Sequence, residues 1–112
     1  MSDQNKLQQQ LGDIAVRYIK RTLGEVDLLR DHLQNLQNGQ LGVLKEIEHL
    51  SHRIHGSGAM FGFDDLSRHA REIELASATH DVSPELHDKL RRHIDDLAAA
   101  VGAAAVERNV PQ

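Results

Sequence analysis

The strongest structural signal in this chain lies at residues 43–63, VLKEIEHLSHRIHGSGAMFGF. Its apolar and small residues recur every three or four positions, as on one face of an α-helix: Val43, Ile47, Leu50, Ile54, Gly58 and Phe61. The period continues through two glycines, although each costs a helix about 1 kcal/mol relative to alanine. We therefore expect a single helix here that ends near Gly62.

Three further helices are predicted around this stretch. An apolar period precedes it over about seven turns, from Leu11 to Leu36, and stops at Asn38-Gly39, a typical left-handed C-cap. A helix that begins with the acidic pair Asp64-Asp65 follows it. Ser83-Pro84 then supplies an N-cap and a first-turn proline for the last helix. The inner face of that last helix is predicted as Leu86, Leu90, His93, Leu97, Val101 and Ala104.

These helices and their short connections predict an all-α fold, an antiparallel up-down-up-down four-helix bundle with loosely ordered termini. We expect the bundle at residues 10–108. A polar segment at residues 1–9, partly disordered or a short helix, precedes it, and a tail at residues 109–112 follows it. The 112 residues, of which 39% are hydrophobic and only 3% aromatic, suit one helical core and are too few for two.

Composition argues against several functional classes. The absence of cysteine excludes disulfides, thiolate metal sites and thiol chemistry. A net charge of −4 without a basic stripe argues against nucleic acid as a partner. No apolar run approaches the ~20 residues that span a bilayer, and the first residues do not resemble a secretion signal, so we expect a cytoplasmic protein with no membrane partner.

His52 is predicted to face solvent. With Ile47 at zero and about 100° per residue, the apolar positions lie within roughly 60° of zero, whereas His52 lies at about 140°. Gly56, one turn later, shares the face of His52, and Ala59 continues a strip of small residues. A second macromolecule could approach the imidazole closely there. In the alternative, the helix ends near His55 and His52 is an ordinary surface histidine.

Glu74 is expected beside His52. If the turn is centred near Phe63, His52 lies eleven residues before it and Glu74 eleven residues after it, so an antiparallel hairpin sets both at one height. A carboxylate there could accept a hydrogen bond from one imidazole nitrogen and leave the other free as a nucleophile. Without the His52 context, Glu74 would be interpreted as a solvated helix acid.

The segment from His52 to Phe63, followed by Leu66 and the pair Ile73-Glu74, resembles the signature of histidine-containing phosphotransfer (Hpt) domains. In that signature a phosphorylated histidine precedes any residue, an aliphatic residue, a basic residue, glycine and a small residue. The resemblance implies a phosphocarrier of two-component phosphorelays, not an enzyme. It would accept a phosphoryl group on His52 from a phospho-aspartyl receiver domain and transfer it to another receiver.

The resemblance also implies roles for individual residues. His52 is the phosphoacceptor, Glu74 orients its imidazole, and Gly56 gives the receiver room. His55 stands where the family usually has lysine, so a permanent cation is replaced by a group that is charged only when protonated, and we expect His55 to contact the phosphoryl group by hydrogen bonding. The receiver is expected to dock on Gly56, Ser57, Ala59, His49, Lys45 and Arg53.

Expected partners are receiver domains and a hybrid sensor histidine kinase, with the chain acting as a monomer. No cofactor or metal is expected on the chain itself, because the resemblance assigns Mg²⁺ to the receiver. The sequence lacks the phosphate loop GxxxxGK[ST], so ATP binding is not expected.

Two other functions stay open. One is a helical metal site, because His49, His52 and His55 recur every three residues. Such a series drifts about 60° per step, so adjacent pairs could chelate an ion but the three cannot converge on one, and an acid such as Glu46, Glu48 or Glu74 would have to complete the ligand shell. The other is an adaptor or dimerisation module that packs through its glycine strip. Met60 and Phe61 are predicted to be core residues rather than docking residues.

Overall fold

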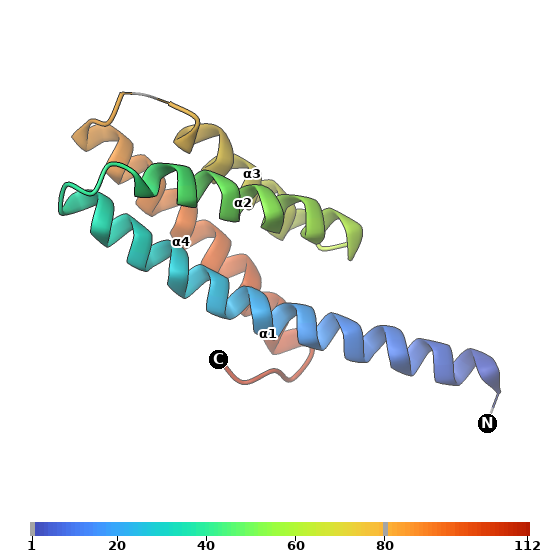
Figure 1. Cartoon of the computed structure of the whole chain (residues 1–112). Helices are drawn as coiled ribbons and strands as arrows, with labels where there is room; N and C mark the ends of the chain where they lie inside the picture. The colour runs from blue at the N-terminus through green and yellow to red at the C-terminus, as the bar shows by residue number, and fades with distance from the viewer. Residues whose placement is uncertain (1, 80) are drawn as a thin grey trace.

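The computed structural model describes residues 2–79 and 81–112 and forms an antiparallel bundle (Figure 1). Each helix packs against its neighbours in chain order, and the last helix also packs against the first. Every regular element in the described residues is a helix, which confirms the predicted all-α four-helix bundle. The helices are α1 Asp3–Gln37, α2 Val43–Met60, α3 Asp64–Ser77 and α4 Pro84–Glu107.

Three of the helices end in the same hydrogen-bonded cap. The residues after α1, α2 and α4 include one with positive φ: Gly39 at 95°, Gly62 at 80° and Asn109 at 56°. At the end of α2, the N–H of Phe63 donates to the carbonyl of Gly58 and the N–H of Gly62 donates to that of Ala59, which is the Schellman pattern. These caps stop the helices sharply, so the connections between α1 and α2 and between α2 and α3 are tight turns.

The core consists of aliphatic side chains from all four helices. On α4 the structure differs from the predicted inner face, because Ile94 is fully buried and His93 is only half-buried. Steps of four and three residues from Leu90 lead to Ile94 and then Leu97, so the apolar stripe continues through Ile94 and leaves His93 at its edge. The largest fully buried side chains include Ile19, Leu29, Leu36, Ile47, Ile54, Leu66, Ile73, Leu90, Ile94, Leu97 and Val101.

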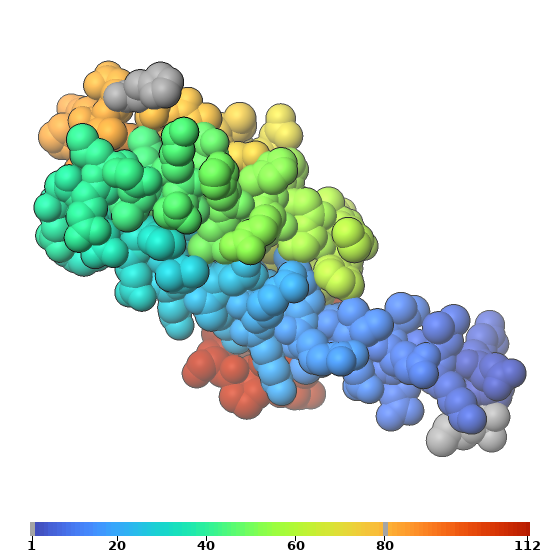
Figure 2. Space-filling view, in the orientation of Figure 1, coloured from blue at the N-terminus to red at the C-terminus, as the bar shows by residue number. Residues whose placement is uncertain are grey.

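Helix α1 begins earlier than predicted. Residues 3–9 continue α1 instead of forming a separate polar segment, and the side chain of Ser2 accepts a hydrogen bond from the N–H of Asn5 as the N-cap. The first turns of α1 project beyond the rest of the bundle (Figures 1 and 2). Leu11, which the apolar period assigned to the inner face, is therefore 57% exposed.

The prediction that Met60 and Phe61 belong to the core is wrong. Met60 is 79% exposed and Phe61 is 38% exposed, because both lie at the end of α2, where the chain turns toward α3. The ring of Phe61 rests at the surface with its centroid 4.7 Å from that of Tyr18 on α1.

The C-terminal tail also differs from the prediction. Residues 109–112 were expected to be loose, but Val110 is buried and its N–H donates to the carbonyl of Ala105. The buried side chain belongs to the residue that closes the cap of α4, a position that often contacts the last helical turn. None of the helices described is both long and apolar enough to cross a bilayer.

Candidate functional site

Contacts of Gly58 and Ser67 fix the position of α2 relative to α3 along the helix axes. A Cβ atom added to Gly58 would lie 3.2 Å from the backbone nitrogen of Ser67 and 3.1 Å from Cδ2 of Leu66, so a larger residue would require α3 or the Leu66 side chain to shift. The hydroxyl of Ser67 donates to the carbonyl of His55 over 2.7 Å. This contact across the two helices sets which residues of α3 lie opposite which residues of α2.

At that register, the structure brings Glu74 of α3 to His52 of α2. Nδ1 of His52 lies 2.5 Å from Oε2 of Glu74. An ionised carboxylate can only accept hydrogen bonds, so Nδ1 is the protonated nitrogen and Nε2 keeps a free lone pair. The His52 side chain is 69% exposed while that of Glu74 is only 22% exposed. The contact with Glu74 thus fixes the tautomer of the neutral ring, and the ring itself is largely open to solvent.

His55 contacts the same carboxylate. Its Nδ1 lies 3.2 Å from Oε1 of Glu74, so each carboxylate oxygen of Glu74 accepts from a different imidazole. The sequence assigned His55 a phosphoryl contact and did not foresee this one. The three-residue spacing of His52 and His55 could have indicated this contact, because it places them on adjacent turns of α2, from which both reach toward α3.

An open groove surrounds these three residues. Two further side chains in it carry charge, Glu48 from α2 and Arg71 from α3. From the sequence, Glu48 was named only as a possible acid of a metal site, and Arg71 was not singled out. Arg71 is exposed and has no ion-pair partner among residues 2–79 and 81–112. Its position three residues before Glu74, one helical turn away, was the available signal. Leu75 and Ala78 complete the lining.

Gly56 serves no packing role. A Cβ atom added there would meet nothing within 4 Å, in contrast to Gly58 two residues later. Gly56 and Ala59 are exposed on α2, so the surface beside His52 has little relief. Because glycine destabilises a helix and Gly56 makes no packing contact that would require it, its location favours a role in giving another molecule access to His52.

The remaining predicted docking residues divide into two groups. His49, Lys45 and Arg53 are exposed on α2. Ser57 is half-buried and its Oγ lies 3.0 Å from the Tyr18 hydroxyl, so it contacts α1 on the side of α2 away from the groove.

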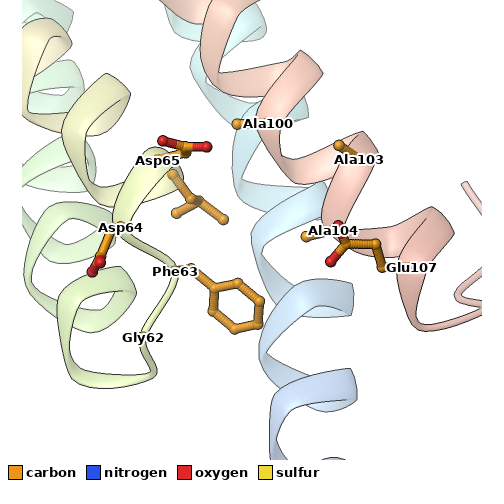
Figure 3. Close-up of a pocket in the computed structure, with 9 residues that line it drawn as sticks. Gly62, Phe63, Asp64, Asp65, Ala100, Ala103, Ala104 and Glu107 are labelled. Carbon is orange, nitrogen blue, oxygen red and sulfur yellow. The ribbon is translucent and has the colours of Figure 1, made fainter.

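A separate pocket lies at the start of α3 and the end of α4. Figure 3 shows Asp64 and Asp65 of α3 and Glu107 of α4 around it, with alanines of α4. None of the residues predicted for the site lines this pocket. Its charged lining residues are all acids, which would repel a phosphoryl group, whereas the groove at His52 also contains the cation Arg71, so that groove is the better candidate for phosphoryl chemistry.

Comparison with protein families gives one result that covers most of the chain. The family model described as the Hpt domain matches residues 4–100. Comparison with curated proteins found no match, and comparison with solved structures found none. The matched residues include all of α2 and α3 and therefore every side chain of the groove.

Proposed function

Because the chain belongs to the Hpt domain family, it has a histidine phosphotransfer role in phosphorelays, and we propose that His52 is its phosphoacceptor. His52 would receive a phosphoryl group from the phospho-aspartate of one receiver domain and pass it to the aspartate of another. The observation that carries this proposal is the contact of His52 Nδ1 with Glu74, which leaves Nε2 unprotonated on a largely exposed ring.

The transfer step needs little covalent chemistry from the protein. The lone pair on Nε2 of His52 attacks phosphorus in line, the P–N bond forms, and the P–O bond to the aspartyl carboxylate breaks. The proton on Nδ1 stays in the hydrogen bond to Glu74. As the imidazole gains positive charge, the carboxylate of Glu74 stabilises it without reorganisation. Transfer to the next receiver is the reverse of these events.

Electrostatic support would come from two residues with different tasks. His55 donates to the second oxygen of Glu74 and so positions the carboxylate that orients His52. Arg71 lines the same groove and carries a permanent charge, so we assign to it the interaction with phosphoryl oxygens that lysine usually makes at the position of His55.

The receiver would approach over Gly56 and Ala59. These small residues let its active-site edge come close to Nε2 of His52, and His49, Lys45 and Arg53 on the same helix are available to its polar surface. We expect the receiver to bring the Mg²⁺ and the acidic pocket that this step requires.

The wider assignment follows from the same site. We propose a phosphocarrier without kinase activity, which works in the cytoplasm between receiver domains and a hybrid sensor histidine kinase. One copy of the chain suffices, because the described groove is built from α2 and α3 of a single chain.

Labelling with a phosphorylated receiver tests the proposal. Wild-type protein should acquire a label that is lost in acid and stable in base, as a phosphoramidate on histidine is. His52→Gln should acquire none, while His32→Gln, which alters a half-buried histidine of α1 outside the groove, should be labelled normally. Equal labelling of His52→Gln and wild type would refute the assignment.

A further inference from the structure

We propose that His52, His55 and Glu74 also form a Zn²⁺ site, and that zinc bound there blocks phosphotransfer. The zinc site stands on the geometry alone. Its effect on transfer rests on the proposed function of His52.

The three residues are already arranged as ligands. One donor atom from each lies within 4.8 Å of the others. In the described part of the chain, no other three histidine, aspartate or glutamate side chains bring their donor atoms together in this way. Glu74 contacts both imidazoles through Nδ1, and their ring centroids are 6.5 Å apart with an angle of 77° between the planes. The rings therefore converge on the carboxylate and do not stack.

The ligand types select the metal. Two imidazole nitrogens and a carboxylate oxygen suit Zn²⁺, which accepts three protein ligands and a water in tetrahedral geometry. With bonds of about 2.0–2.1 Å, tetrahedral ligands lie about 3.3 Å apart, so rotations of the exposed His52 and half-buried His55 rings would suffice. Mg²⁺ prefers an octahedral shell of oxygens and should not compete.

The third ligand comes from α3 and not from the histidine series of α2. His49 is exposed and belongs to no group of converging donors in the described residues. Successive members of the series diverge by about 60°, and only the pair His52 and His55 faces Glu74. The helix pairing thus supplies the carboxylate that a site on α2 would lack.

Zinc would remove the nucleophile of His52. Metal coordination uses the lone pair of Nδ1, and the single proton of the neutral ring then resides on Nε2. Nε2 has no free lone pair in that tautomer and cannot attack phosphorus. Linkage makes the effect reciprocal, so a phosphoryl group on Nε2 should weaken zinc binding.

Calorimetric titration of the full, untagged, unphosphorylated chain with zinc chloride tests the site. We expect one zinc per chain at micromolar affinity and no heat of binding with magnesium chloride. His55→Ala and Glu74→Gln should each weaken zinc binding at least about tenfold, the effect that even outer-shell changes have at metal sites. The matched control His49→Ala should bind as wild type does. Circular dichroism confirms that each variant is folded.

Two titration results would overturn the site. One is unchanged affinity in His55→Ala. The other is an equal loss in His49→Ala, which would show adventitious binding by dispersed histidines.

The effect on transfer is measured with a phosphorylated receiver in excess Mg²⁺, with and without zinc. Zinc should slow transfer to wild type more than tenfold, and a chelator should restore it. The ratio of rates with and without zinc should be close to one in His55→Ala, whatever the basal rate of that variant. Equal inhibition of both proteins would mean that zinc acts on the receiver and would overturn the block. Absence of transfer to wild type without zinc would instead refute the proposed function, and the calorimetric result would stand.

Discussion

The carboxylate of Glu74 bridges His52 and His55, with Oε2 2.5 Å from Nδ1 of His52 and Oε1 3.2 Å from Nδ1 of His55. One acid on α3 therefore fixes the tautomer of two imidazoles on α2. Glu74 is mostly shielded while His52 is exposed. The carboxylate therefore binds Nδ1 of His52 and leaves Nε2 of the exposed ring without a partner in the described residues.

Replacing the bridging acid should impair transfer without unfolding the protein. Glu74→Gln loses a charge-assisted hydrogen bond worth about 1.5–3 kcal/mol, which corresponds to a rate of transfer about tenfold to a hundredfold lower. Single-turnover kinetics with a phosphorylated receiver measure the rate. Glu72→Gln, an exposed acid on the same helix, is the control and should transfer normally. A normal rate in Glu74→Gln would remove Glu74 from the mechanism.

The two glycines of α2 should respond oppositely to alanine. Gly56→Ala fills open space and should raise the free energy of unfolding by about 1 kcal/mol. Gly58→Ala forces a Cβ against α3 and should lower it by about 1–3 kcal/mol. Urea denaturation compares the two variants. Stabilisation by both changes would show that the close approach at Gly58 is not a constraint.

Access over Gly56 should be limiting for the receiver. Gly56→Leu places a branched side chain beside His52 where no packing partner exists, so the fold should persist while receiver binding weakens at least tenfold. Binding is measured by titration against an unphosphorylated receiver. Leucine at Arg92, an exposed position on α4, is the control. Wild-type affinity in Gly56→Leu would place the docking surface elsewhere.

Arg71 should stabilise the phosphorylated form. Arg71→Ala removes an exposed cation from the groove, and exposed charge pairs contribute about 0.2–1 kcal/mol, so the equilibrium ratio of phosphorylated to unphosphorylated protein should fall about 1.4- to fivefold. Arg71→Lys should retain much of it. The fraction is measured after equilibration with a phosphorylated receiver, with Arg92→Ala as the control. An unchanged fraction in Arg71→Ala would assign the cationic role to another residue.

The fold was largely predictable because its determinants are local. Asn38-Gly39 and Ser83-Pro84 mark helix ends through backbone conformation and capping, and both were confirmed. The position of Glu74 opposite His52 followed from counting outward from the turn, because the cap at Gly62 gives that turn a defined centre.

Features that depend on tertiary surroundings could not be predicted. An apolar period does not reveal whether another element lies opposite, so Leu11 and Phe61 were assigned to the core although the bundle leaves both exposed. The polar residues 3–9 carry no period, and their helix follows from the cap at Ser2 and continuity with α1. The contact of His55 with Glu74 and the position of Arg71 in the groove depend on how α2 and α3 are rotated about their axes, which the spacing of residues in each helix leaves undetermined.

The central claim is that Nε2 of His52 accepts the phosphoryl group while Glu74 holds the proton on Nδ1. Long-range proton–nitrogen NMR of labelled protein reads both nitrogens of each imidazole before and after phosphorylation by a receiver. The account predicts a neutral His52 ring protonated on Nδ1 in the free protein, and phosphorus coupled to Nε2 of that same ring afterwards. Phosphorus on Nδ1 of His52, or on any other histidine, would contradict it.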